Sequence, residues 1–429
     1  MSHKSLVVIL LAFGLTTHFL FFGHPNQTVF DEVHFGKFVS GYYTHEYYFD
    51  IHPPLGKIMI AGFGKLFNFQ PEFSFAEIGD EFPDSKYMAL RFLPSLMGSL
   101  LPAVIFFLAL QLGFSRRAAF ATGLLVALEN GILVQTRFML MDGFLILFGF
   151  LSLLFYLKSR SKILNTKYLI LASIFAGLAA SIKWTGLSFL GIILVMEVIK
   201  IWKTKKIGLA APSAVKFIII PIAVYFAVFA LHFALLTKPG TGDAFMSQEF
   251  HNKNTLDKFV ELNIEMYRSN QRLMASHPYS SQWYTWPLMT RPIFYWTKDA
   301  ARIYLLGNPL IWWGSTIAVL YALLSSLKLK VKSEKIDKTL ALLLGGFAFN
   351  FLPFIGIKRV MFLYHYLAAL IFAILILAYI IEKEKNSKKI FGALLVGGII
   401  AFIYFAPLSY GLPLSKKAYE SHVWLPSWK

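Results

Sequence analysis

The most regular feature of this sequence is a series of long apolar segments separated by short polar ones. Read as membrane-spanning helices of roughly 17–25 residues each, these segments number about eleven. The expected spans are approximately 5–22, 88–113, 118–135, 138–157, 168–183, 185–200, 214–236, 309–327, 339–356, 360–381 and 390–409. The pattern therefore predicts an all-α polytopic membrane protein with one domain over residues 1–429.

The first apolar segment has two interpretations. A Lys at position 4 followed by the apolar run Leu6–Phe22 resembles a secretory signal peptide. The run is long, however, and no small-residue cleavage site follows it, so we expect a retained first span.

Composition agrees with a membrane protein. Charged residues are only 15% of the chain and hydrophobic residues are 57%, whereas soluble domains carry about a quarter charged residues. The absence of cysteine excludes disulfides and thiolate metal sites.

The net charge of +18 would indicate nucleic-acid binding in a soluble protein. Here the basic residues gather in alternate short loops, and the sequence predicts no nucleic-acid partner. The clusters are Arg116-Arg117; Lys158, Arg160, Lys162 and Lys167; Lys200, Lys203, Lys205 and Lys206; Lys328, Lys330, Lys332, Lys335 and Lys338; and Lys383, Lys385, Lys388 and Lys389. If Lys4 is cytoplasmic, all these clusters fall on the cytoplasmic side, which supports the span assignment.

Two long loops, about 23–87 and 237–308, then lie on the external side. Both are rich in aromatic residues, His and Pro, which suits amphipathic helices lying in the membrane interface. Within 33–48, for example, Phe35, Phe38 and Tyr42 recur at helical spacing. No internal repeat is evident, although a transporter built from inverted repeats often shows one.

The acidic pair Asp31-Glu32 follows the first span directly. In one interpretation Asp31 caps the following helix and Glu32 favours its positive end. In the other, Asp31 is a general base held at the depth of the lipid headgroups. The two roles are compatible.

A rigid motif, His52-Pro53-Pro54-Leu55-Gly56-Lys57, lies later in the same loop. The two prolines fix an extended turn of the backbone. The simpler interpretation of the motif is a purely structural turn that leads the chain back to the membrane. The alternative adds a cation, His52 or Lys57, that faces a phosphate.

Three cations lie at the external ends of predicted spans, Arg91, Arg137 and Lys183, and the carboxylate Asp142 lies inside the fourth predicted span. Each of the three side chains, taken alone, could simply extend its charged group to the membrane–water interface. Together, the three would suit an anionic lipid headgroup. Asp142, about one turn into its span, is costly to bury without a partner, and Arg137 and Lys183 are candidate partners.

The second long loop and the tenth span contribute further candidates: His277, Tyr279, Trp283, Asn308, Tyr364 and His365. The aromatic residues suit a belt at headgroup level, and they also suit stacking against a sugar or a peptide. The histidines are scattered, so we expect no metal site. No phosphate-binding loop or nucleophile motif occurs in a fitting context, and we expect no cofactor.

At these residues the sequence resembles the protein O-mannosyltransferase family of membrane glycosyltransferases, in the GT-C class. The matching elements are Asp31-Glu32-Val33-His34-Phe35, His52-Pro53-Pro54-Leu55-Gly56-Lys57, Arg91-Phe92-Leu93-Pro94, Arg137-Phe138-Met139-Leu140-Met141-Asp142, Lys183-Trp184-Thr185-Gly186-Leu187, His277-Pro278-Tyr279, Trp283, Trp286-Pro287, Gly307-Asn308-Pro309 and Tyr364-His365-Tyr366. They run through nearly the whole chain in the family's order. Two features differ. The second loop lacks room for the β-trefoil MIR domain of eukaryotic members, as in prokaryotic relatives, and Leu367-Ala368-Ala369 stands where members often have a proline.

The resemblance implies a GT-C bundle of eleven spans and an inverting, metal-independent mannosyltransferase. Its donor would be polyprenyl-phosphate-mannose, and its acceptor would be Ser or Thr of a translocated polypeptide, on the external face of a prokaryotic cell membrane. The resemblance associates the position of Asp31 with acceptor activation and that of Arg91 with the donor phosphate. Two other functions remain open. One is a GT-C enzyme with a lipid or polymer acceptor. The other is a transporter or lipid-binding scaffold, which only Asp142 favours.

Overall fold

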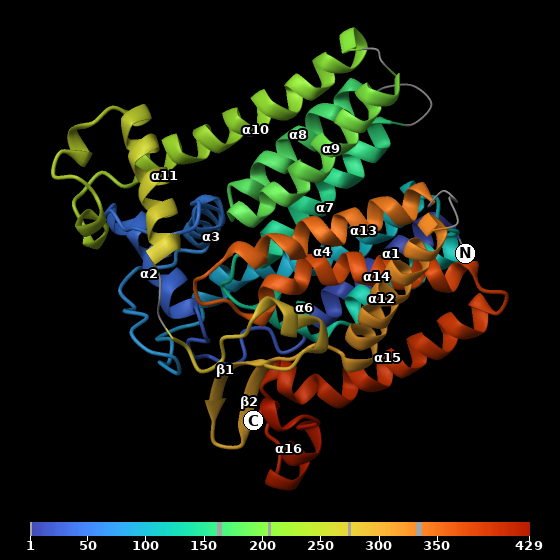
Figure 1. Cartoon of the computed structure of the whole chain (residues 1–429). Coiled ribbons are helices and arrows are strands. Elements are labelled where there is room, and N and C mark those ends of the chain that lie inside the picture. Colours follow the sequence, from blue (N-terminus) through green and yellow to red (C-terminus); the bar gives the residue numbers. More distant parts are fainter. Residues whose placement is uncertain (1, 161–164, 205–206, 273–275, 332–336) are drawn as a thin grey trace.

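The structure is a computed structural model that describes residues 2–160, 165–204, 207–272, 276–331 and 337–429. Figure 1 shows a bundle of long helices with shorter elements gathered at one end. The α-helices are α1 (His3–Phe19), α2 (Glu32–Thr44), α3 (Leu55–Leu66), α4 (Tyr87–Gln111), α5 (Arg116–Ala127), α6 (Asn130–Arg137), α7 (Asp142–Ser159), α8 (Thr166–Ala180), α9 (Leu187–Thr204), α10 (Ile207–Leu235), α11 (Thr255–Arg272), α12 (Pro309–Val331), α13 (Lys338–Phe351), α14 (Leu367–Lys383), α15 (Ser387–Tyr410) and α16 (Lys416–His422). Strands β1 (Ile293–Lys298) and β2 (Ala301–Leu305) form an antiparallel hairpin.

The predicted spans correspond to helices. Within the described residues, 8 helices are long and apolar enough to cross a membrane, or 9 if the pair α5 and α6, bent by 57°, forms one span. The shorter apolar helices α1 and α8 occupy the positions of the two remaining predicted spans. The polytopic fold is thus confirmed, and a count of eleven requires both short helices.

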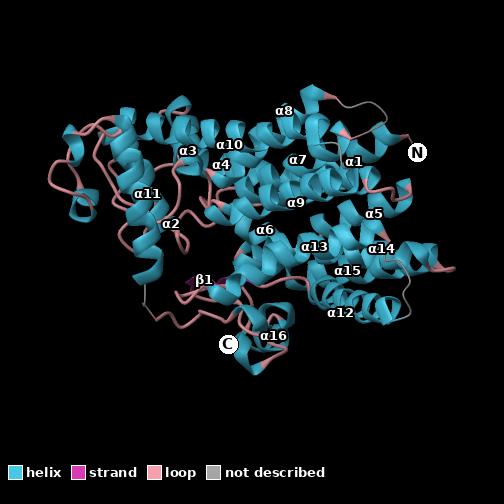
Figure 2. Ribbon diagram, turned by 45° about the horizontal axis from the view of Figure 1, so that its top comes forward, coloured by secondary structure: helices cyan, strands magenta, loops and turns pink. Residues whose placement is uncertain are grey.

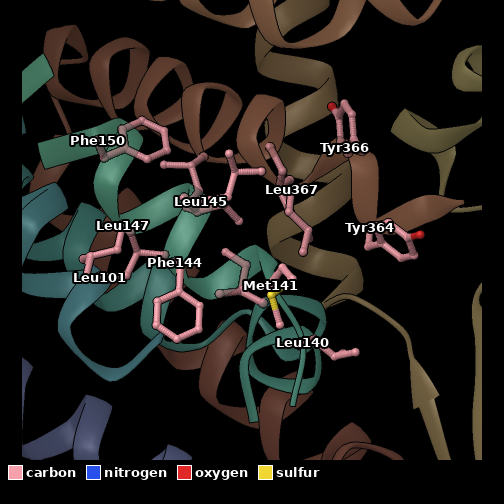
Figure 3. Packing of buried hydrophobic residues seen from close by; sticks show 14 of the residues in the cluster. Leu101, Leu140, Met141, Phe144, Leu145, Leu147, Phe150, Tyr364, Tyr366 and Leu367 are labelled. Carbon is pink, nitrogen blue, oxygen red and sulfur yellow. The ribbon is translucent and has the colours of Figure 1, made fainter. Parts of the chain in front are cut away.

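The long helices enclose a continuous apolar core. Helix α4 packs against α1, α5 and α7, and α14 packs against α12 and α13. Figure 3 shows Leu145 of α7 beside Leu367 of α14 in the middle of this core. Because α7 and α14 are apolar over most of their circumference, both are suited to the interior of the bundle.

The two ends of the bundle differ. Helices α2, α3 and α11 and the hairpin lie at the end opposite the N-terminus (Figures 1 and 2). The ends of α7, α9 and α14 that carry basic residues lie on the N-terminal side. Lys162, Lys205, Lys206, Lys332 and Lys335 lie outside the described residues. Both long loops therefore contribute to the same end of the bundle.

The structure corrects three local predictions. Helix α2 forms as expected, but its apolar residues Phe35, Val39 and Tyr42 are buried in the protein instead of facing the membrane interface. The all-α class needs the small β1–β2 hairpin added to it. Residues 138–141 are not helical, so Asp142 lies in the first turn of α7, where a carboxylate is favoured by the helix dipole, and not one turn inside the span.

Candidate functional site

The N-terminus of α2 presents Asp31 at its cap position. Asp31 is only partly buried, and its side chain makes no capping hydrogen bond. The capping interpretation of this carboxylate is therefore wrong. The preceding residue, Phe30, has a left-handed backbone (φ 47°) that L-residues rarely adopt, and it is held by stacking on Tyr295 with ring centroids 4.2 Å apart. The Asp31 carboxylate after this strained junction has no hydrogen-bond or ion-pair partner among the described residues.

Glu32, by contrast, is fully buried and fully bonded. Arg91 donates to its two carboxylate oxygens from Nε at 2.7 Å and Nη2 at 2.6 Å. The backbone N–H groups of Val29 and Met139 add bonds of 2.9 Å each. This pair links the first loop to α4 and to the segment before α7.

Arg91 also donates to backbone carbonyl oxygens, including those of Pro25 at 2.6 Å and Gln27 at 2.7 Å. Every N–H of its guanidinium has an acceptor within the protein. The structure therefore does not support contact between Arg91 and a donor phosphate. Its geometry is that of a positioning residue for Glu32 and, through the backbone, for Asp31.

A second buried ion pair joins α7 to the end of α8. Lys183 Nζ lies 2.9 Å from both carboxylate oxygens of Asp142, and Gln135 donates to Asp142 Oδ2 at 2.6 Å. Lys183 also lies 5.1 Å from the ring centre of Tyr364. Of the two candidate partners for Asp142, Lys183 is confirmed by these contacts. Arg137 instead donates to the carbonyl oxygens of Leu20 and Phe21.

Electrostatics connect Asp31 to this pair. Burial raises the pKa of Asp31 to about 7, Lys183 opposes the rise, and the carboxylates Asp142 and Asp50 add to it. An aspartate with a pKa near neutrality can accept a proton and is still substantially ionised at physiological pH. Asp31 therefore has the protonation behaviour of a general base.

The His-Pro-Pro motif forms a corner with its own internal ion pair. Lys57 is buried, donates to the Asp50 carboxylate, and donates to the carbonyl oxygen of His52 at 2.9 Å. Burial, with Lys183, Arg359 and Lys57 nearby, lowers the pKa of His52 well below its ordinary value. The lowered pKa favours the neutral form of His52, and Lys57 is paired with Asp50, so the geometry does not favour either residue as the phosphate-binding cation that the sequence suggested.

Three cavities adjoin one another at the site, and each neighbouring pair shares lining residues. The inner cavity, 280 Å³, has a mostly apolar lining that includes Leu145, Phe349 and Phe354 together with Asp142. The middle cavity, 180 Å³, is lined by His52 and Asn270 among others, and shares Lys183 and His365 with the inner one. The outer cavity, 420 Å³, is lined largely by hydroxyl, amide and basic side chains, and shares Lys358 and Arg359 with the middle one.

Among the predicted site residues, the cavity linings thus bring together Asp142, Lys183, His52, Tyr364 and His365. Asp31 is linked to them through Phe30, whose ring lies 6.3 Å from that of Tyr364.

Four other predicted residues make structural contacts within the protein. His277 contacts Phe362 with ring centroids 5.0 Å apart, Tyr279 stacks on Phe294 at 5.8 Å, and Trp283 packs edge-on against Phe351. Asn308 is fully buried and donates to the carbonyl oxygens of Leu128 and Gly398, while its own N–H donates to Glu129 at 2.9 Å. Asn308 therefore holds α5, α12 and α15 together instead of facing a substrate.

Arg359 and Gln135 are site residues that the sequence prediction omitted. Arg359 lines two cavities, and in the part of the chain that the structure describes it forms no ion pair. A signal for it existed, because Lys358-Arg359 is a basic pair at the end of the bundle opposite the basic clusters. Gln135 gave no comparable signal, since a single amide in an apolar helix has no recognisable spacing. Among the described residues, no group of three or more His, Asp or Glu side chains is placed to hold a metal ion.

Solved structures with the same architecture define the class of the fold. The yeast Pmt1–Pmt2 protein O-mannosyltransferase complex bound to its sugar donor matches with a TM-score of 0.94 at 20% identity, over 100% of this chain and 93% of the other. ArnT from Cupriavidus metallidurans, bound to undecaprenyl phosphate, matches with a TM-score of 0.59 at 16% identity, over 94% and 64% of the two chains. The fold is that of a polytopic GT-C membrane glycosyltransferase.

Sequence comparison identifies the family. The model described as dolichyl-phosphate-mannose-protein mannosyltransferase matches residues 8–237, and the model for the C-terminal four TMM region of protein-O-mannosyltransferase matches residues 255–428. The chain belongs to the protein O-mannosyltransferase family.

Individual relatives match over part of their length. Protein O-mannosyltransferase 1 of Drosophila melanogaster is 35% identical over 260 residues, which are 57% of this chain and 29% of that protein. Dolichyl-phosphate-mannose–protein mannosyltransferase 4 of Candida albicans is 35% identical over 263 residues, 57% of this chain and 34% of the relative. The match thus spans about a third of the length of these curated relatives.

Proposed function

We propose that this protein transfers mannose from a polyprenyl-phosphate-mannose to Ser or Thr hydroxyls of polypeptides, with inversion at the sugar, and that Asp31 is the general base. The observation that carries the proposal is the partly buried Asp31 carboxylate, which has no capping bond and a pKa near 7, within the electrostatic reach of the Lys183–Asp142 pair. Its family membership and the names of its relatives supply the donor and the acceptor class.

The acceptor hydroxyl oxygen attacks C1 of mannose while its proton passes to Asp31. The bond between C1 and the phosphate oxygen breaks, and the electron pair leaves with the polyprenyl phosphate. A phosphate monoester has a second pKa of about 6, so this leaving group departs without a general acid. Single displacement inverts the sugar configuration and needs no enzymic nucleophile.

Positive charge near the leaving phosphate would stabilise the transition state. Lys183 and Arg359 are suited to this role because both line the middle cavity, between an apolar cavity that fits the start of a lipid chain and a polar one. Arg359 is the better candidate, since Lys183 is already paired with Asp142. His365 lines the same cavity, and its ring is held parallel to Trp286 at 5.8 Å.

The orientation of the site follows from charge. The site lies at the end opposite the N-terminus and the basic helix ends, and the positive-inside rule supports an external location for it. In a prokaryotic cell this is the outer face of the cell membrane, where polypeptides emerge from the translocon.

The test uses purified protein in lipid, radiolabelled polyprenyl-phosphate-mannose and a Thr-containing peptide. We expect label on the peptide and a loss of roughly 10²–10⁴-fold in kcat for Asp31→Asn, the usual contribution of a general base. Asp84→Asn is the matched control, because Asp84 is exposed in the same loop. Undiminished transfer by Asp31→Asn would remove the proposed base, and label found only on lipid or polymer would replace the acceptor class.

A further inference from the structure

The outer cavity is a polar hollow between three parts of the chain that are distant in sequence. Its lining comes from the second loop, from the segment before α14 and from the C-terminal segment: Ser280, Ser281, Gln282, Thr285, Thr290, Arg291, Lys358, Arg359, Val360, Met361 and Ser427. Most of these side chains offer hydrogen-bond donors or acceptors, and only Val360 and Met361 are apolar. Such a lining suits a polar chain and does not suit a lipid tail.

The walls of this cavity are fixed by hydrogen bonds. Ser281 N–H donates to the carbonyl oxygen of Met361 at 2.9 Å, which joins the second loop to the segment before α14. Arg291 donates to the carbonyl oxygens of Pro278 at 2.8 Å and Ser427 at 3.1 Å, which joins the loop to the C-terminal segment. The cavity is therefore preformed, and ligand binding would cost little conformational entropy to order its walls.

A series of contacts connects the wall of the outer cavity to the neighbourhood of Asp31. The wall that contains Val360 and Met361 continues directly into Phe362, whose ring lies 6.1 Å from that of Phe30. Phe30 immediately precedes Asp31. An extended chain lying along this wall would thus pass beside the residue that positions Asp31.

The charge of the cavity is unbalanced. Three cations line it, and no acidic side chain does so among the described residues. Arg291 is engaged by carbonyl oxygens, but Lys358 is exposed and, within the described part of the chain, forms neither an ion pair nor a side-chain hydrogen bond. The cavity therefore attracts negative charge through Lys358 and Arg359.

We propose that the outer cavity binds the acceptor polypeptide beside its Ser or Thr, and that Lys358 selects segments with a carboxylate next to the acceptor hydroxyl. This inference rests on the proposed function and adds a specificity to it. Lys358 and Arg359 both line the outer and the middle cavity. The partly buried Arg359 would serve the donor phosphate, while the exposed Lys358 would serve the peptide.

The test compares two short peptides with one central Thr, flanked on both sides by Glu in one peptide and by Gln in the other. For the wild-type protein we expect a KM for the Glu peptide that is about 2–5-fold lower, with equal kcat, because exposed ion pairs contribute modestly. Added salt should abolish the difference. Lys358→Glu should reverse the preference, and Lys416→Glu, which makes the same charge change on an exposed residue of α16 outside the cavity, should not.

The outcomes separate the two proposals. Transfer to both peptides with equal KM, unchanged in Lys358→Glu, would overturn the inference and leave the proposed function standing. A raised KM for the mannosyl donor in Lys358→Glu, with peptide KM unchanged, would also overturn it, because Lys358 would then serve the phosphate. If the wild-type protein transfers mannose to neither peptide, nor to any other peptide tested, the proposed function fails and the inference fails with it.

Discussion

Replacing Glu32 by Gln tests whether this residue acts in the chemistry or in the framework of the site. The structure assigns it to the framework, because all four hydrogen bonds to its carboxylate come from within the protein. The side chains of Glu32 and Arg91 are 0% and 2% exposed. The substitution leaves Arg91 as a buried charge without a counter-charge and turns an amide NH₂ toward groups that are themselves donors.

The expected cost follows from this geometry. Removing one partner of a buried ion pair typically destabilises a protein by about 3–5 kcal/mol. At roughly 1.4 kcal/mol per factor of ten, the ratio of folded to unfolded protein falls about 10²–10⁴-fold. We expect the contacts of Arg91 with the rings of Tyr87 and Phe138, 5.0 and 5.1 Å away, to recover only part of this loss.

The assay is thermal unfolding of purified variants in one detergent, beside mannose transfer at a temperature where the wild-type protein is stable. Glu72→Gln, an exposed change in the same loop, is the control. The double variant Glu32→Gln with Arg91→Gln should cost much less than the sum of the single changes, because the two residues share one interaction. An unchanged melting temperature with activity abolished would refute the framework role and make Glu32 a participant in the reaction.

Three further predictions concern other parts of the site. Because Asp31 must be ionised to accept a proton and its pKa is raised to about 7, kcat/KM should rise with pH through about 7 and level off above it; a pH–rate profile without this limb would contradict the base assignment. Arg359→Gln should raise the KM for the mannosyl donor by roughly tenfold or more, as expected for loss of a charged hydrogen bond, while peptide KM is unchanged, which steady-state kinetics with both substrates would measure. The exposed stripe Leu256, Val260, Ile264 and Tyr267 on α11 should contact lipid; since the chain has no cysteine, a polarity-sensitive dye on Val260→Cys reports this directly, and emission no bluer than from Arg268→Cys on the polar flank would contradict it.

The sequence predicted where the helices of this protein lie along the chain better than which residues pack against them. Apolar runs located the spans and basic clusters located one end of the bundle, because both signals depend on local composition alone. The helix over Glu32–Thr44 was likewise recognisable from its spacing. What covers its apolar face was not, since Phe75 and His232, which pack there, are far away in the sequence.

The site shows the same limit. The motifs named Asp31, Asp142 and Lys183 as candidates, and the last two pair as one of the two expected arrangements. The sequence could not reveal that Arg91 and Asn308 form their hydrogen bonds within the protein. Apart from the Glu32 carboxylate, which pairs with Arg91, their side-chain acceptors are backbone carbonyls that carry no residue-type signal. Whether a polar side chain contacts substrate or bonds to other parts of the protein depends on distances between residues that only the folded structure defines.

The break between α5 and α6 has a consequence for biogenesis. Glu129 lies at this break and accepts hydrogen bonds from the backbone of Gly131 and of Asn308, and Asn130 beside it donates to Ser409 near the end of α15. The side-chain amide of Asn130, at the kink of an early span, thus donates to a segment that the ribosome makes much later. A nascent chain halted before α15 would leave the Asn130 amide without its acceptors Phe402 and Ser409 within the bilayer. The polar contacts of the kink are therefore completed only after α15 is made, and chains truncated before α15 should be preferred targets of membrane quality control.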